Sequence, residues 1–223
     1  MYISRNTQKK ELKGYMKFTT DKTGALFHEL SNYNFLSGFT FVGGSAVAYY
    51  LNHRLSEDLD FFTWSSSLPA ETDSFIKKIS KNRKVEITNY THAYLDIFID
   101  GSKITLFAND WDILKINRKK IENNIYAADL DLLCAMKINA LSLRAKFRDY
   151  YDLYVLNIEK YSLNTMLEFA FKYIPGITKK VFGMQLTYID DIEDENINHL
   201  APKYKVSLSE IQMHFTNELK KIL

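Results

Sequence analysis

The stretch FVGGSAVAYYLNHRLSEDLDFFTW, Phe41–Trp64, decides the fold of this chain. An apolar run ends at two glycines followed by Ser45, a pattern typical of a buried strand that turns into a helix. We therefore expect a strand over Phe39–Val42 and Ser45 as the N-cap of a helix over Ala46–Leu51. The aromatic-rich run Leu59–Thr63 predicts the next strand.

Asp58 and Asp60 are one residue apart at the start of that second strand. Side chains alternate along a strand, so both carboxylates point to one face, with Cα atoms roughly 6.5–7 Å apart. Carboxylates this close repel each other and raise one of the two pKa values. A divalent cation removes that cost, and hard oxygen ligands suit Mg²⁺. The pair therefore predicts a magnesium site.

Gly43, Gly44 and Ser45 predict a phosphate site beside these acids. Glycines let the backbone approach a ligand, and the start of a helix presents free N–H groups to an anion. The hydroxyl of Ser45 can bond a phosphate oxygen. A Gly-Gly-Ser motif alone is more often a plain helix start, and an Asp-x-Asp motif alone is more often a solvated acid pair. Together they predict binding of a nucleoside triphosphate with its Mg²⁺.

The rest of the chain divides near residue 125. Before it, short β-like runs alternate with helical patterns; after it, the pattern is almost wholly helical. Asp100-Gly101 predicts a type I′ hairpin turn. The expected fold is α+β: residues 1–124 form a mixed β-sheet flanked by helices, with an N-terminal helical extension, and residues 125–223 form a C-terminal helical region that completes the active site. The further expected elements are helices over Thr20–Asn34, Ala70–Ser80, Tyr150–Asn157, Thr165–Tyr173, Thr178–Tyr188 and Leu208–Leu223, and strands over Lys84–Tyr90, Ala93–Ile99 and Lys103–Ala108.

A helix beginning at Ala128 is predicted by apolar residues in alternating steps of three and four. These are Leu133, Met136, Ala140, Leu143 and Phe147. If that helix is continuous, Lys137, Arg144 and Arg148 share a neighbouring face, from which they could clamp phosphates; a solvated charged face is the alternative. Asp149 and Asp152 lie near a helix start, where capping or an ion pair with Arg148 is the alternative to a functional role.

Composition excludes some classes of protein. A net charge of +2 rules out a strongly basic nucleic-acid coat. The single cysteine, Cys134, cannot form an internal disulfide, which suits the cytoplasm, and we expect it in the core. No apolar run is long enough to span a membrane, and no apolar segment of a signal peptide follows Met1.

Two segments resemble a known family. GGSAVAYYLNHRLSEDLDFF (Gly43–Phe62) carries the Gly-Gly-Ser and Asp-x-Asp pattern of the DNA polymerase β-like nucleotidyltransferase superfamily and is similar, more narrowly, to the AbiEii/AbiGii-type toxins. MKINALSLRAKFRDYYDLYVL (Met136–Leu156) resembles a second segment of that family, and LTYIDDIEDE (Leu186–Glu195) a third, more weakly.

The resemblance implies transfer of a nucleoside monophosphate from an NTP to a hydroxyl, with release of pyrophosphate. Members of the family act as toxins of toxin–antitoxin or abortive-infection systems, and some modify the 3′ end of tRNA. It implies that Gly44 and Ser45 hold phosphate, that Asp58 and Asp60 hold one or two Mg²⁺ ions, and that Lys137 contacts the triphosphate. The implied partners are the NTP, an RNA (tRNA) or protein acceptor, and an antitoxin that acts without a stable complex.

The same resemblance makes Asp149 the carboxylate that is essential in relatives. One departure concerns the catalytic base: many superfamily members carry a third acid on a nearby strand, where this chain has Thr105. Asp96 on the neighbouring strand could take the place of this third acid. The alternative is that Asp96 is an exposed residue of the hairpin.

Several basic residues admit two interpretations. Arg54 either contacts the phosphates or pairs with Asp58. His53 is expected to pack against its neighbours or to cap a helix rather than to bind a ligand. The run Lys115–Lys120, KINRKK, is expected to form a loop that contacts RNA or is simply solvated. Two alternative functions stay open: a nucleotidyltransferase that modifies a small molecule such as an antibiotic, and a degenerate, non-catalytic nucleotide-binding module.

Overall fold

A seven-stranded mixed sheet forms one half of the molecule. The computed structural model describes residues 18–222, and within them the strand order is β3-β4-β5-β2-β1-β7-β6. β2 pairs with β1 antiparallel and with β5 parallel, so it is a central strand. The strands are β1 (Thr40–Val42), β2 (Leu59–Thr63), β3 (Val85–Tyr90), β4 (Tyr94–Ile99), β5 (Ser102–Ala108), β6 (Arg118–Glu122) and β7 (Ile125–Ala128).

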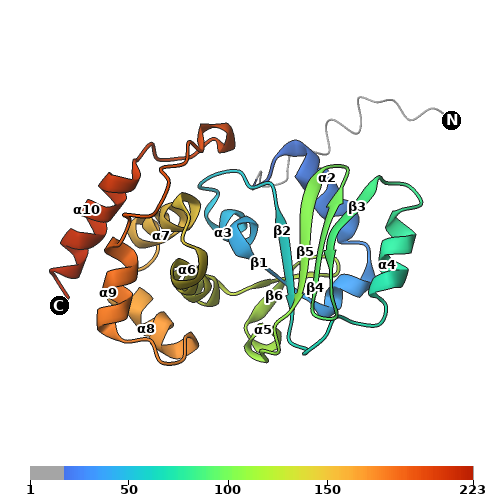
Figure 1. Ribbon diagram of the computed structural model, residues 1–223, viewed down its shortest axis with the longest axis horizontal. Coiled ribbons are helices and arrows are strands. Elements are labelled where there is room, and N and C mark those ends of the chain that lie inside the picture. The colour runs from blue at the N-terminus through green and yellow to red at the C-terminus, as the bar shows by residue number, and fades with distance from the viewer. Residues whose placement is uncertain (1–17, 223) are drawn as a thin grey trace.

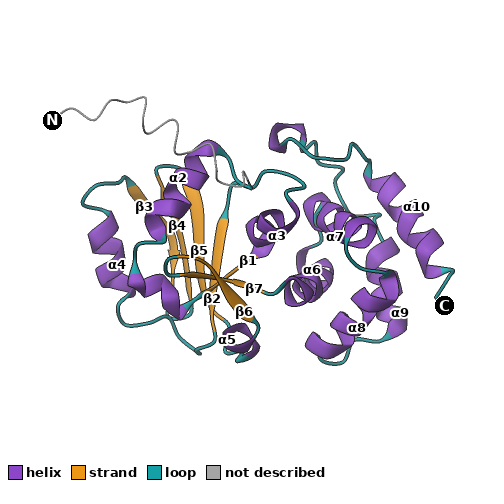
Figure 2. Ribbon diagram, turned by 180° about the vertical axis from the view of Figure 1, so that it is seen from behind, coloured by secondary structure: helices purple, strands orange, loops and turns teal. Residues whose placement is uncertain are grey.

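Helices cover the two sides of this sheet unequally. Figure 1 shows α2 (Asp21–Leu30) and α4 (Thr72–Ile79) on one side and α3 (Gly43–Leu51), followed by the helical half, on the other, and Figure 2 shows the same arrangement from behind. The remaining helices are α5 (Ile113–Ile116), α6 (Leu130–Arg144), α7 (Phe147–Glu159), α8 (Leu163–Tyr173), α9 (Lys179–Thr187) and α10 (Leu208–Leu219), with 3-10 turns at Asn34–Gly38 and Asn198–Leu200. The α+β class with a mixed, helix-flanked sheet is confirmed.

The core lies where the alternation of the strands places it. On β2, Leu59 and Phe61 are buried, whereas the alternate residues Asp60 and Phe62 stay partly exposed on the opposite face. β1 is buried along its whole length because the sheet continues on both sides of it and α3 lies over it. No helix within residues 18–222 is long and apolar enough to cross a bilayer.

The hairpin between β4 and β5 has the predicted turn. Asp100 and Gly101 have φ values of 50° and 81°, which are the positive values that a type I′ turn requires at both central positions. This turn sets the register that pairs Asp96 with Thr105 and so determines which side chains share the face with Asp60.

Several predicted helix boundaries are wrong, and two of them lie before β2. α3 begins at Gly43 with Val42 as its N-cap, because Gly43 adopts φ +74° and turns the chain directly from strand to helix. Ser45 is therefore not the N-cap but a residue of the first turn. α2 ends at Leu30, and the 3-10 turn from Asn34 replaces its predicted end.

The long helix predicted through Phe147 is broken. α6 ends at Arg144, Ala145 takes an extended conformation (φ −45°, ψ 128°), and α7 begins at Phe147. Arg, Ala and Lys at this point are good helix formers, so tertiary packing rather than propensity breaks the helix. The predicted stripe is wrong at Leu143, which is 76 % exposed. Cys134 is buried in the core, as predicted.

The basic run Lys115–Lys120 is not a loop. α5 ends at Ile116 and strand β6 begins at Arg118. The guanidinium carbon of Arg118 lies 4.6 Å from the ring centroid of Trp64 and 4.5 Å from that of Tyr126, so this arginine is a packing residue.

Candidate functional site

The turn from β1 into α3 is packed directly against Asp60. A Cβ added at Gly43 would lie 2.1 Å from Oδ2 of Asp60, and one at Gly44 would lie 2.6 Å from Nη2 of Arg54. Both distances are far below van der Waals contact. The two glycines are therefore needed because a carboxylate and a guanidinium occupy the space that side chains would fill.

The start of α3 is open to an anion. Among the described residues no side chain caps the N-terminus of this helix, so its first N–H groups lack a capping acceptor. The buried hydroxyl of Ser45 donates a hydrogen bond to the backbone carbonyl of Asp58. Ser45 thus ties the helix start to the segment that carries the acid pair, and its hydroxyl proton is already used in this bond.

Asp58 and Asp60 form a carboxylate pair whose mutual repulsion is only partly offset. Burial raises the pKa of Asp60 to about 6, the negative charge of Asp58 adds to this effect, and the positive charges of Lys137, Arg144 and Lys103 oppose it. Two carboxylates that influence each other offer hard oxygen donors, which fit a divalent cation such as Mg²⁺ that takes its other ligands from phosphates and water. No group of three or more His, Cys, Asp and Glu side chains that could hold a metal occurs within residues 18–222.

The raised pKa of Asp60 predicts a stability cost in the metal-free protein. The folded state keeps this proton up to about pH 6, whereas the unfolded chain loses it near 3.8, so the free energy of unfolding falls as the pH rises between these values. Asp60→Asn should therefore raise the free energy of unfolding at pH 7.5 by roughly 1–3 kcal/mol and lose this advantage at pH 4. Urea unfolding in EDTA at both pH values measures the change. A variant less stable than the wild type at pH 7.5 would contradict this assignment.

A buried ionic network joins α3 to the helical half. Arg54 donates from Nε and Nη2 to the two carboxylate oxygens of Asp152, at 2.8 and 2.9 Å. His53 lies 2.7 Å from Asp152 through Nε2, and Lys137 lies 2.7 Å from both Asp152 and Asp149. These side chains are at most 9 % exposed. The network fixes α6 and α7 against the loop that follows α3.

The charges of this network are set by their neighbours. Burial alone would raise the pKa of Asp152, but Arg54, Lys137 and His53 hold it well below the usual range. Burial likewise would lower the pKa of Lys137, but Asp149 and Asp152 outweigh it and the pKa is raised. Burial lowers the pKa of His53, so its neutral ring donates from Nε2 to Asp152.

Lys137 and Asp149 of this network keep capacity for a ligand. The ammonium of Lys137 has three N–H donors, and two are directed at Asp149 and Asp152. Oδ2 of Asp149 is buried and has no hydrogen-bond partner among the described residues. An unpaired buried carboxylate oxygen is costly, and it suits the acceptance of a hydrogen bond from a bound hydroxyl.

The three predicted cations do not share one helix face. The break between α6 and α7 leaves Arg144 exposed at the end of α6, within electrostatic range of Asp60. Arg148, on α7, pairs with Glu195 of the acidic loop, defined as Asp190–Glu195, with 3.0 Å between Nη2 and Oε1. Arg54 pairs with Asp152. The sequence had suggested the phosphates or Asp58 as its partner, and neither suggestion names Asp152.

A row of polar residues beside the acid pair was only partly predicted. Asp60, Thr105 and Asp96 lie directly opposite one another on β2, β5 and β4. Asp96 is not an exposed hairpin residue, because only 14 % of its side chain is exposed, and it accepts hydrogen bonds from Thr105 and Tyr94. Nζ of Lys103 lies 2.9 Å from Oδ2 of Asp96. The sequence alone did not indicate this lysine, because its position beside the acids depends on the strand order.

These donors make Asp96 a poor proton acceptor. Burial would raise its pKa, but the hydrogen bonds from Thr105, Lys103 and Tyr94 outweigh burial and lower it. A general base works best with a pKa near the operating pH. Asp96 is better suited to hold Lys103 and Tyr94 in place.

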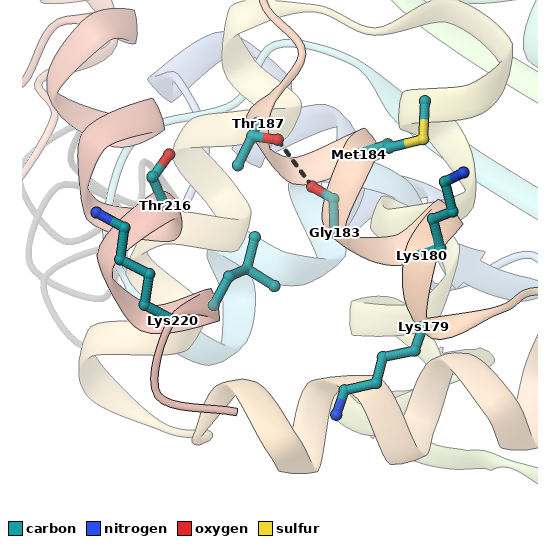
Figure 3. A pocket seen from close by; sticks show the side chains of 8 residues that line it. Lys179, Lys180, Gly183, Met184, Thr187, Thr216 and Lys220 are labelled. Atoms are coloured by element: carbon teal, nitrogen blue, oxygen red, sulfur yellow. Dashed lines mark hydrogen bonds between the residues drawn. The ribbon is translucent and has the colours of Figure 1, made fainter. Parts of the chain in front are cut away.

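A hollow lies away from the acid pair, between α9 and α10. Its volume is about 770 Å³, and Figure 3 shows three lysines around it and the hydrogen bond from Thr187 to the carbonyl of Gly183. The lining residues are Lys179, Lys180, Gly183, Met184, Thr187, Thr216, Leu219 and Lys220. Because no carboxylate lines this hollow, it offers no second acid site of the kind found on β2.

Comparison with known proteins agrees with this fold. The family model described as nucleotidyl transferase AbiEii toxin, type IV toxin–antitoxin system, matches residues 24–176. The protein aq_aa25 of Aquifex aeolicus is 26 % identical over 187 residues, which cover 83 % of this chain and 88 % of that protein.

Two solved structures are similar in fold. JHP933 from Helicobacter pylori has a TM-score of 0.53 at 17 % identity, over 92 % of this chain and 93 % of that one. MenT4, a nucleotidyltransferase toxin from Mycobacterium tuberculosis, has a TM-score of 0.51 at 12 % identity, over 84 % of this chain and 81 % of that one. At these identities the likeness concerns the fold alone.

The family match covers more than half of the chain, and it includes the Gly43–Phe62 segment and all five residues of the buried network. The chain therefore belongs to the AbiEii nucleotidyl transferase toxin family and is a nucleotidyltransferase.

Proposed function

We propose that this protein transfers a nucleoside monophosphate from an NTP to an acceptor hydroxyl in a Mg²⁺-dependent reaction, as the toxin of a toxin–antitoxin or abortive-infection system in the cytoplasm. The favoured acceptor is an RNA 3′ end such as that of tRNA, ahead of a protein hydroxyl. The observation that carries the proposal is the contact of Gly43 with Asp60, since it puts an uncapped helix N-terminus and a carboxylate pair at one place.

Each part of a bound Mg-NTP has a matching group. The N–H groups of Gly43, Gly44 and Ser45 would bind the phosphates, and the remaining N–H of Lys137 would reach the same anion. Mg²⁺ on Asp58 and Asp60 would polarise the α-phosphate and neutralise the leaving pyrophosphate. Arg144, exposed at the end of α6, would add positive charge at the mouth of the site.

The helical half would complete the site from the other side. Asp149 would accept a hydrogen bond from a bound hydroxyl through its free Oδ2. Arg54 would act through Asp152, by holding Lys137 in place, rather than by touching phosphate. Arg148 would keep the acidic loop in place through Glu195. In this proposal residues 1–124 bind the metal and phosphates, and residues 125–223 supply Lys137 and Asp149.

The reaction balances without a further reactant. The acceptor oxygen forms a bond to the α-phosphorus as the bond from that phosphorus to the β-phosphate oxygen breaks, and pyrophosphate leaves. The hydroxyl proton passes to a base or to water. An antitoxin would restrain this activity without a stable complex.

Release of pyrophosphate tests the proposal. The wild-type protein, incubated with each NTP, Mg²⁺ and whole-cell RNA, should release pyrophosphate, and EDTA or the double substitution Asp58→Ala/Asp60→Ala should abolish the release. Expression of the wild type should arrest growth, and the double variant should relieve the arrest. Nucleotide binding without pyrophosphate release would instead indicate a non-catalytic module, and a labelled small-molecule product would indicate an antibiotic-modifying enzyme.

A further inference from the structure

Aromatic side chains lie beside the acid pair on one face of the sheet. Phe62 of β2, Phe107 of β5 and Tyr94 of β4 are directly opposite one another. Opposed residues on neighbouring strands point to the same face, so these rings form a row next to the row of Asp60, Thr105 and Asp96. All three are partly exposed, and the ring centroid of Phe107 lies 5.1 Å from that of Phe62 and 5.9 Å from that of Tyr94.

This face is the one on which α3 lies. The carboxylate of Asp60 touches Gly43 at the start of α3, and Figures 1 and 2 show that α2 and α4 cover the opposite side of the sheet. The alternate residues of β4 and β5, such as Leu95 and Leu106, point to that covered side and are fully buried. The aromatic row therefore extends the metal site outward over β5 and β4.

One cation is held in this surface. Nζ of Lys103 lies 2.9 Å from Oδ2 of Asp96, and the hydroxyl of Tyr94 donates to the same oxygen at 3.0 Å. Thr105 donates to Oδ1 at 2.7 Å. Asp96 thus fixes both the lysine and the tyrosine, while 34 % of the Lys103 side chain remains exposed. The platform, defined as Phe62, Tyr94, Phe107 and Lys103, is a built surface rather than a chance patch.

The position of the platform follows from the geometry of phosphoryl transfer. The attacking and leaving oxygens are roughly in line through the phosphorus. In the proposed function the triphosphate lies at the start of α3, which follows β1 on one side of β2, so the leaving pyrophosphate is on that side. The acceptor must then approach from the other side of β2, where β5 and β4 lie.

We propose that the platform binds the unpaired 3′ end of a nucleic acid strand, with a terminal base stacked on Phe107 and Tyr94 and a backbone phosphate at Lys103. This inference rests on the proposed function and adds its acceptor-binding surface. Aromatic rings with a neighbouring cation are the usual means of holding unpaired bases without sequence preference. A protein acceptor would need a wider contact, on the order of 800 Å² on each partner, whereas a few ring faces suffice for a strand end.

Binding of an oligonucleotide tests the platform separately from catalysis. The probe is a 5′-fluorescein-labelled, unstructured 12-nucleotide oligoribonucleotide with a free 3′ hydroxyl, and anisotropy reports its binding at low salt. Phe107→Leu and Lys103→Gln should each weaken binding about 10-fold or more. In Phe107→Leu, binding of Mg-ATP, measured by thermal shift, should change less than about twofold, because this substitution leaves the phosphate and metal groups and the charge of Lys103 beside Asp60 unchanged.

Matched variants keep the result interpretable. Phe171→Leu alters a 53 % exposed phenylalanine of α8, and Lys172→Gln alters an exposed lysine beside it; both should bind the probe as the wild type does. Phe107→Trp keeps a ring and should retain binding, with quenching of tryptophan fluorescence when a base stacks on it. A DNA probe of the same sequence shows whether the platform discriminates between sugars.

The outcomes separate the two proposals. Oligonucleotide binding that depends on Phe107 and Lys103 without any nucleotidyl transfer would support the platform and refute the proposed activity. Transfer to RNA with unchanged binding by Phe107→Leu and Lys103→Gln would refute the platform alone. Failure of the wild type to bind the probe, or labelling of protein only, would also refute it.

Discussion

Gly43→Ala is expected to reduce nucleotidyl transfer about 100-fold or more while leaving a folded protein. The added Cβ would lie 2.1 Å from Oδ2 of Asp60, so the carboxylate must move, and a displacement of about 1 Å in a catalytic group costs on the order of 100-fold. The rate of pyrophosphate release measures the loss, and circular dichroism confirms the fold.

Gly176→Ala is the matched control for this substitution. Gly176 has the same φ of +74°, but a Cβ there would meet nothing within 4 Å. Both variants carry the backbone strain of a left-handed alanine, roughly 1–3 kcal/mol, and only Gly43→Ala disturbs the acid pair. Equal losses of activity in the two variants would show that strain, and not the contact with Asp60, is responsible.

Asp152→Asn is expected to lower the free energy of unfolding by about 3–5 kcal/mol. The substitution removes the carboxylate that neutralises the charge of Arg54 and part of the charge of Lys137. Breaking a buried ion pair in this way leaves charge without compensation. Because the pKa of Asp152 is well below its usual range, the loss should be complete at pH 7 and should shrink as the pH falls below about 4. Urea unfolding at pH 7 and at pH 3 measures both.

An exposed ion pair provides the comparison. Arg83 contacts Glu29 and Asp100, with about a third of each side chain exposed, and Arg83→Ala should cost less than about 1 kcal/mol. If Asp152→Asn costs no more than Arg83→Ala, the network is not the joint between α3 and the helical half that the structure indicates.

The parts of the site that could be predicted are those written in local sequence. Gly43, Gly44, Asp58 and Asp60 lie within one short segment, so spacing and strand alternation were enough to relate them. The hairpin at Asp100 was predictable for the same reason, because its turn depends on two adjacent residues. The reason for the glycines was not predictable, since it is the contact with Asp60 and Arg54 in the folded chain.

The remaining parts depend on contacts between distant residues. Arg54 and Asp152 are 98 positions apart, and no periodicity relates them. The break at Ala145 falls among good helix formers, so local propensity favours a continuous helix. Lys103 becomes a neighbour of the acid pair only because β5 pairs with β2. Non-local pairing of this kind is decided by tertiary packing.

The proposed chemistry rests on Asp58 and Asp60, and one gel tests it. Wild-type protein and the Asp58→Ala/Asp60→Ala variant are each incubated with one α-³²P-labelled NTP at a time, Mg²⁺, whole-cell RNA and whole-cell protein, and the products are resolved. We expect a labelled RNA band with the wild type and none with the double variant. Undiminished labelling by the double variant would contradict the assignment of these two carboxylates as the catalytic centre.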